Sequence, residues 1–374
     1  MSNSTGNVQS EPFVRVVKRA ELPAAKTTLL RLLAVLLSLI AGGVFIACVG
    51  QNPFVIYGTI LSGAFRSVMA FQGTVKVMIP LLISSLGVTL AFKMKFWNIG
   101  AEGQIIFGAT CATFFALFCS EMNHILLIIV MFLAGFIGGG LWGLIPAVFK
   151  VKYNTNETLF TLMLNYIALH IVSYLRDGPW MDPESQGFPK IARFEKNASL
   201  DKLFGIQFGW LIALILVALV FIYLKFCKQG YEISVVGESQ DTARYAGMNV
   251  KRIILRTMFL SGGICGMAGM IQATGSDITL TTSVAGGVGF TAIIIAWLAQ
   301  LNPISILVVS FLFSVLEKGS SVVQSNFGLS TDCADVLQGI ILFFILGCEF
   351  FVRYRFVFSN KNSSLKSDKK EMEG

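Results

Sequence analysis

Charged residues and histidines are scarce in this sequence of 374 residues. Only 13% of the residues are charged and 55% are hydrophobic, whereas ordinary soluble proteins carry roughly 25% charged residues. A soluble fold could not bury so much apolar surface, so the composition indicates a polytopic membrane protein. The two histidines, His124 and His170, lie far apart in the sequence, which argues against a histidine-based catalytic site.

Other features of nucleotide-binding and metal-binding proteins are also missing. None of the seven cysteines has CxxC spacing, so we expect neither a metal site nor a disulfide framework. No G-x-x-x-x-G-K-[ST] loop occurs, so any ATP that the protein uses must be bound by another chain. The net charge of +8 fits basic residues that flank membrane spans on their cytoplasmic side, and we expect no nucleic acid partner.

Ten apolar runs are candidates for membrane-spanning helices, which need about 20 apolar residues each. The first run is longer than a signal-peptide core and lacks a small-residue cleavage site, so it predicts an uncleaved helix. The eighth run is short and begins with glycine. The ten predicted spans are 29–49, 74–93, 103–119, 124–147, 158–176, 206–226, 254–274, 286–299, 303–324 and 333–352.

Lysine and arginine concentrate in alternate loops, which favours an all-α bundle with both termini in the cytoplasm. The expected parts are a cytoplasmic N-terminal segment at 1–28, a transmembrane domain at 29–352 and a disordered cytoplasmic tail at 353–374. Within the transmembrane domain we expect a large external loop at 177–205 and a cytoplasmic segment at 227–253.

Polar residues form a stripe along the predicted ninth span, with a spacing of four and three residues that places them on one helical face. A carboxylate in this stripe must face protein or water, because exposure to lipid is costly. Lys318 follows in sequence and is expected to point about 100° away. The stripe predicts either a pathway lining or a contact between helices. Its members are Ser310, Ser314, Glu317, Ser321 and Gln324.

The predicted fifth span carries Glu157, Thr161 and Asn165 on one face. Asn165 lies about two turns inside the membrane, and a buried amide needs polar partners. Those partners are either another helix or a passing polar substrate, and we favour the substrate.

Glycine-rich faces mark two predicted spans. Gly135, Gly139 and Gly143 recur every four residues in the fourth span, and Gly262 and Gly266 share a face of the seventh. Small residues at such spacing let helix backbones approach closely. We therefore expect these glycines to determine the packing of the bundle and to have no role in binding a solute.

A short helix is predicted within the cytoplasmic segment, between Glu238 and Met248. Ser239 is suited to the N-cap and Gly247 to the C-terminal stop. The surface of this helix would be formed by Ala243, Tyr245 and Ala246. On the residues alone, the helix is either a connector or a docking site for a partner protein.

The stretch FWNIGAEGQIIFGA, at 96–109, interrupts two apolar runs with glycines, amides and Glu102. A catalytic role for Glu102 lacks partner groups, and the glycines do not follow the dinucleotide-binding pattern. The stretch therefore predicts a break between two spans, with the next span beginning near Gly103. Glu102 would accept backbone N–H groups at that break, while Asn98 and Gln104 are better candidates to meet a substrate.

Three motifs together resemble the permease subunits of bacterial ABC importers for nucleosides and simple sugars. They are FWNIGAEGQIIFGA at 96–109, NETLFTLMLNYIA at 156–168 and GESQDTARYAGMNVKRIILRTMFLSGGICGMAGM at 237–270. The stretches at 52–65 and 285–307 are also similar to that family. The resemblance covers about residues 50–350.

The resemblance implies that two permease chains, identical or paralogous, form a pathway across a bacterial inner membrane. It implies an extracytoplasmic substrate-binding lipoprotein outside and ATPase subunits inside, with ATP and Mg²⁺ bound by the ATPases and no cofactor in this chain. The region around Glu238, Ala243, Tyr245, Ala246 and Gly247 would couple the ATPase to the bundle.

The expected solute is a purine-type nucleoside or related neutral molecule, with riboflavin and simple sugars as alternatives. Such solutes are bound by amides, hydroxyls and aromatic faces. The expected pathway residues are Trp97, Asn98, Glu102, Gln104, Asn165, Phe290, Ser314 and Glu317.

Two other functions are compatible with the same composition. An ion-coupled secondary transporter would titrate Glu317, Glu102 or Asp335. A membrane enzyme would need a cluster of catalytic groups near one face, and the sequence offers none.

Overall fold

The computed structural model describes most of the chain, and the described residues are 14–18, 23–185, 187–328, 336–337, 339–340, 343–344, 347–348, 350–352 and 354–358. The chain forms two compact units. The first unit joins Met1–Phe54 with Asp335–Gly374, and the second is Val55–Ala334.

In the first unit, strand β1 (Val14–Lys18) pairs antiparallel with strand β4 (Tyr354–Phe358). Strand β4 lies within the segment 353–374 that the sequence analysis expected to be disordered, and the rest of that segment lies outside the described residues. Helix α1 (Ala24–Cys48) belongs to the same unit and covers all but the last residue of the first predicted span, 29–49. Of the predicted span 333–352, the residues 336–337, 339–340, 343–344, 347–348 and 350–352 are described and helical, and the others lie outside the described residues.

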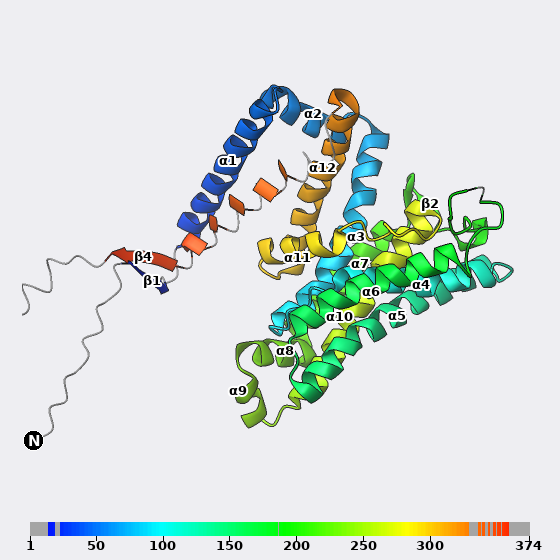
Figure 1. The fold of residues 1–374 in the computed structure, drawn as a ribbon. Coiled ribbons are helices and arrows are strands. Elements are labelled where there is room, and N and C mark those ends of the chain that lie inside the picture. The colour runs from blue at the N-terminus through cyan, green and yellow to red at the C-terminus, as the bar shows by residue number, and fades with distance from the viewer. Residues whose placement is uncertain are drawn as a thin grey trace, which may run out of the picture. The chain divides into compact units, whose positions relative to one another are not determined.

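The second unit is a helical bundle (Figure 1). Its elements, in chain order, are α2 (Pro53–Phe65, with its first two residues in the other unit), α3 (Val68–Lys93), α4 (Ala101–Phe118), α5 (His124–Tyr153), α6 (Glu157–Asp177), a 3₁₀ turn η1 (Lys196–Ala198), β2 (Lys202–Leu203), β3 (Ile206–Gln207), α7 (Gly209–Phe226), α8 (Lys228–Glu238), α9 (Gln240–Tyr245), α10 (Val250–Gln272), a π-helical turn η2 (Ala273–Asp277), α11 (Val288–Leu298) and α12 (Pro303–Phe327).

The predicted count of ten spans is not confirmed in the described part of the chain. Seven of its helices are long and apolar enough to cross a membrane, and α1 with α2 would make an eighth as one broken span. The seven are α3, α4, α5, α6, α7, α10 together with η2, and α12.

The predicted span 286–299 fails because its helix is too short. Helix α11 has 11 residues, which at about 1.5 Å per residue cover roughly half of a hydrocarbon core about 30 Å thick. Hydropathy recorded the apolar character of this stretch but not its length as a helix. Helix α2, with 13 residues, was not expected as a helix at all.

Helix α10 is the centre of the second unit and packs against α3, α4 and α5. Glycines bring α5 and α10 into backbone contact, as their spacing predicts. A Cβ atom at Gly139 would lie 2.6 Å from the Cα of Gly266, and one at Gly143 would lie 2.8 Å from the carbonyl oxygen of Met258. These distances are shorter than any real Cβ contact, so the packing depends on glycine.

Helices α8 and α9 lie together at one end of the second unit (Figure 1). They follow the C-terminal end of α7, and α8 packs against the ends of α3 and α10. The side chains of Glu232 on α8 and Arg256 on α10 form an ion pair at 3.0 Å, and both are largely buried. The two short helices are therefore fixed to the central helix of the bundle.

Candidate functional site

The break between α3 and α4 is held by two amides. Asn98 and Gln104 are buried and bond each other through both amide groups, at 3.2 Å each. Asn98 Oδ1 also accepts the backbone N–H of Gly100 at 3.0 Å. In this conformation Asn98 and Gln104, which were expected to meet a substrate, therefore use these polar atoms to hold the loop.

Helix α6 fixes the same loop from the side. Asn165 Oδ1 accepts the N–H of Gly103 at 2.8 Å, and its Nδ2 donates to the carbonyl of Ile99 at 2.9 Å. Thr161 Oγ1 accepts the N–H of Ile99 at 3.2 Å. The partners of Asn165 in this structure are thus backbone groups of the loop, which satisfies its buried amide.

Glu102 joins this loop to the start of α11. Its two carboxylate oxygens accept the N–H groups of Gly287 and Gly289 at 2.8 and 2.7 Å. The sequence analysis expected Glu102 to accept backbone N–H groups at the break, next to its own helix. The acceptor role is present, but the donors belong to the N-terminus of another helix, where a carboxylate is favoured by the helix dipole. Because Glu102 and its two donors are far apart in the sequence, no local sequence pattern indicates that they are bonded.

The aromatic residues of the sequence analysis lie elsewhere. Trp97 stacks on Trp297 at 5.7 Å between ring centroids and contacts Phe92 at 5.6 Å. Trp97 is 49% exposed and Phe290 is 41% exposed. Neither is among the residues that line the cavity described next.

A cavity of about 570 Å³ lies between α3, α12, the end of α10 and the segment before α11. Its walls come from the first half of α3 and the second half of α12, so it lies in the half of the bundle away from α8 and α9. Its polar lining side chains are Gln72, Lys76, Gln272, Ser276, Ser283, Glu317 and Lys318.

Of the expected stripe on α12, only Glu317 lines this cavity. Ser310 and Ser314 are fully buried, and Ser314 donates to the carbonyl of Phe311 in its own helix at 2.7 Å. Lys318, which was expected to point about 100° away from Glu317, also lines the cavity. Sequence reasoning missed Lys76 and Gln272, whose positions in apolar helices give no sign of their common cavity.

Glu102 also determines the backbone that forms part of the cavity wall. Gly286 and Val288 line the cavity, and Gly287 between them donates to the Glu102 carboxylate. Gly287 has φ +84°, a left-handed conformation that glycine adopts without strain. The conspicuous loop between α3 and α4 is therefore connected to the cavity through one carboxylate.

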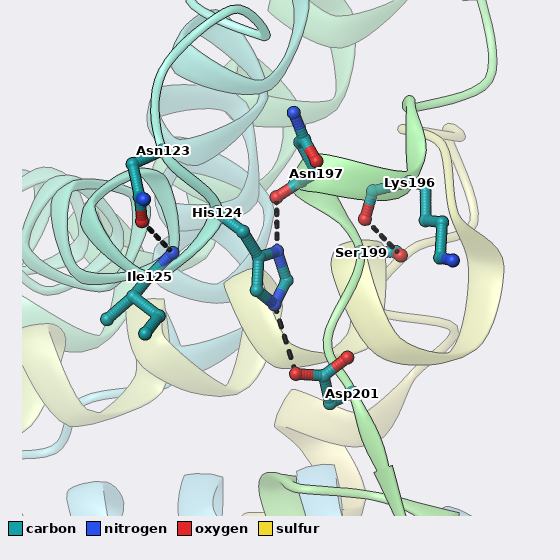
Figure 2. A network of polar contacts seen from close by, with 7 residues as sticks. All are labelled: Asn123, His124, Ile125, Lys196, Asn197, Ser199 and Asp201. Carbon is teal, nitrogen blue, oxygen red and sulfur yellow. Dashed lines mark hydrogen bonds and ion pairs between the residues drawn. The ribbon is translucent and has the colours of Figure 1, made fainter.

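The external loop of the sequence analysis is folded against the end of the bundle that contains η2. Leu200 N–H donates to the carbonyl of Thr274 at 3.1 Å, and Phe194 N–H donates to Ile278 at 3.0 Å. At its other side, His124 at the start of α5 contacts the Asn197 carbonyl at 2.8 Å and Asp201 Oδ2 at 3.0 Å (Figure 2). Both partners are acceptors, so the ring that makes both bonds carries hydrogen on each nitrogen.

The short helix predicted around Glu238–Met248 is present as α9, with Glu238 as the last residue of α8. Ser239 is its N-cap and accepts the Thr242 N–H at 3.2 Å, as predicted. Gly247 follows the helix with φ +75° and ends it.

The surface of α9 differs from expectation at one residue. Tyr245 is 93% exposed, and Ala246 and Gly247 are also exposed. Ala243 is fully buried, so it supports the helix from inside and offers no surface to a partner. The surface that α9 presents is therefore centred on Tyr245.

Comparison with known proteins gives a consistent result. The family model described as "Branched-chain amino acid transport system / permease component" matches residues 69–346. The glucose ABC transporter permease protein TsgB13 of Haloferax volcanii is 31% identical over 336 residues, which cover 86% of this chain and 88% of that protein. The guanosine ABC transporter permease protein NupP of Bacillus subtilis is 28% identical, over 85% of this chain and 92% of its own. The nucleoside ABC transporter permease protein NupB of Lactococcus lactis is 28% identical, over 86% and 91%.

Proposed function

This chain belongs to the permease family of the branched-chain amino acid transport system, and we propose that it forms the pathway by which an ABC importer takes up a nucleoside or a related neutral solute. As a multi-pass ABC transporter permease it is not an enzyme, and ATP hydrolysis belongs to a separate ATPase subunit. On this proposal, ATP and Mg²⁺ are bound by that ATPase.

The cavity beside Glu317 is the observation that supports the pathway. It is the right size for a small solute, since ligand cavities commonly measure about 300–1,000 Å³. Its amide, hydroxyl and ammonium groups can bond the hydroxyls and ring carbonyls of a nucleoside. Relatives named for guanosine, nucleosides and glucose support a polyhydroxy solute, and riboflavin remains an alternative.

In this proposal the pathway residues fall into two groups. Glu317 contacts the solute directly, together with Lys76 and Gln272. Glu102 acts by holding the cavity wall in place. Asn98, Gln104, Asn165 and Ser314 keep the surrounding backbone in shape, and Trp97 and Phe290 lie outside the cavity in this conformation.

Partners are proposed at both ends of the bundle. Tyr245 and its exposed neighbours on α9 would dock on the ATPase, and the Glu232–Arg256 ion pair would carry its motion into α10. A second permease chain, identical or paralogous, would complete the pathway in a bacterial inner membrane. An extracytoplasmic lipoprotein would deliver the solute to the cavity side.

The experiment uses single cysteines in a cysteine-free background, at Ser276 and Ser283 in the cavity and at the buried Ser84 as a control. Water-soluble thiol reagents are expected to label the two cavity positions, and the transported solute is expected to protect them while leaving Ser84 unreactive. Failure of every tested nucleoside, sugar and flavin to protect either position would contradict the assignment of the cavity.

A second experiment separates this proposal from an ion-coupled transporter. Tyr245→Ala is expected to lower uptake and ATPase stimulation at least tenfold in vesicles that contain the ATPase partner. Tyr231→Ala, which alters an exposed tyrosine on α8, serves as the control. Uptake that survives Tyr245→Ala but is abolished when the proton gradient is dissipated would identify the secondary transporter instead.

A further inference from the structure

A second pocket lies at the opposite end of the bundle, among the ends of three helices. Its volume is about 490 Å³. Lys93 contributes from the last turn of α3, Phe221 and Lys225 from the last turns of α7, and Asn302 and Pro303 from the start of α12. The end of α3 also contacts Gly237 of α8. The pocket therefore lies at the level where the spans leave the membrane, on the side of α8 and α9.

The charged groups of this pocket have one sign. Lys93 and Lys225 line it, and no described lining residue is acidic. Neither lysine forms an ion pair with another described residue. Lys93 is half-buried. The Lys225 ammonium lies 5.3 Å from the centroid of the Phe221 ring and 5.6 Å from that of Phe226, which keeps its stem against the helix end.

Helix dipoles offset only part of this charge. The C-termini of α3 and α7 each contribute about −0.5 elementary charge, while the N-terminus of α12 contributes about +0.5. Two ammonium groups therefore leave an excess of about one to one and a half positive charges in the pocket. Snorkelling lysines at span ends are common, but here two of them line one pocket together with a helix N-terminus, so they offer two ammonium groups to a single anion.

We infer that this pocket binds the phosphodiester headgroup of an anionic phospholipid. The position at the end of the spans places the ammonium groups at headgroup depth, and basic pockets between transmembrane helices suit such headgroups. Apolar side chains Phe221, Leu224 and Leu301 line the same pocket and can pack against the glycerol and first methylenes. The inference requires only a membrane-spanning chain and is independent of the transported solute.

The test measures lipid binding to the purified full-length chain by native mass spectrometry in detergent. Phosphatidylglycerol, phosphatidylcholine and inorganic phosphate are titrated separately. The variants are Lys93→Gln with Lys225→Gln, the charge-preserving Lys93→Arg with Lys225→Arg, and a control pair. The control is Lys152→Gln with Lys251→Gln, which removes two exposed lysines at other span ends.

The wild-type chain is expected to retain phosphatidylglycerol in preference to phosphatidylcholine. Near a membrane surface each lysine strengthens binding by about fivefold, so the double glutamine variant is expected to lose roughly 25-fold in affinity. The arginine pair and the control pair are expected to keep it. Absence of a preference in the wild type, an equal loss in the control pair, or equal binding of inorganic phosphate would overturn the inference. The wild-type and arginine measurements decide the matter even if the glutamine variant does not fold.

Discussion

Glu102 and Gly287 are 185 residues apart in sequence and are joined by a 2.8 Å hydrogen bond from the glycine N–H to the carboxylate. With the second bond from Gly289, this contact fixes the start of a half-length helix to the loop between α3 and α4. It also fixes the backbone of the cavity wall, because residues on both sides of Gly287 line the cavity. The loop between α3 and α4 and the wall of the cavity are therefore held together by the same carboxylate.

We expect Glu102→Gln to loosen this wall. An amide can accept only one of the two N–H groups through its oxygen, and a hydrogen bond to a charged group contributes about 1.5–3 kcal/mol. Hydrogen exchange of residues 284–290 should therefore accelerate, and solute uptake should fall. Glu121→Gln, which alters an exposed carboxylate in an external turn, should change neither. Unchanged protection in the Glu102 variant would refute the bridging role.

Asn165→Ala is expected to destabilise the chain. The substitution removes the amide oxygen and the amide nitrogen that bond the loop. The Gly103 N–H and the Ile99 carbonyl are then left buried and unsatisfied, at a cost of about 1–3 kcal/mol each. Thermal unfolding in detergent measures the effect, and the exposed Asn326 provides the control, Asn326→Ala. If Asn165→Ala kept full stability and lost only solute binding, the amide would be a substrate contact.

Gly266→Ala tests the contact between α5 and α10. The new Cβ would lie 2.9 Å from the Cα of Gly139, so the helices must separate, and such overpacking costs typically 1–3 kcal/mol. Gly58→Ala is the control, because nothing lies within 4 Å of a Cβ at that position. The two variants should differ clearly in unfolding temperature and in yield, and similar values would show that the bundle can absorb the extra methyl.

Arg256→Gln should uncouple α8 from α10. The ion pair is largely buried, so its loss is expected to cost about 1.5–3 kcal/mol. ATPase activity should become less sensitive to solute, while the isolated chain keeps its fold. The exchange Glu232→Arg with Arg256→Glu should restore part of the coupling, and Lys251→Gln should have no effect. If the exchange gave no rescue, Glu232 and Arg256 would act independently of each other and not through their ion pair.

Much of the bundle could be predicted because long apolar runs and helix caps are local signals. The predicted spans at 74–93, 124–147 and 303–324 all lie within or close to observed helices. Ser239 and Gly247 bound α9 as their chemistry requires. Hydropathy could not distinguish a half-length helix such as α11 from a full span, since both are equally apolar over their length.

The cavity could not be predicted for a different reason. Lys76 and Lys318 lie on separate helices, and only the tertiary packing brings them to one cavity. The reciprocal bonds of Asn98 and Gln104 depend on the path of an irregular loop. Polarity marked both amides as important, but it gave no indication of whether their partners would be protein or solute.

The shortness of α11 has a consequence for the energy barrier to permeation. The helix begins with Val288 at the cavity and ends at the turn before α12, and its 11 residues can cover at most about half of the bilayer thickness. On the proposed function, a solute in the cavity would face a septum at most about 16 Å deep where α11 lies. Gln300 and Leu301, both with left-handed backbones (φ +54° and +55°), lie at the far end of that septum, where a small rotation of the turn would shift the whole short helix.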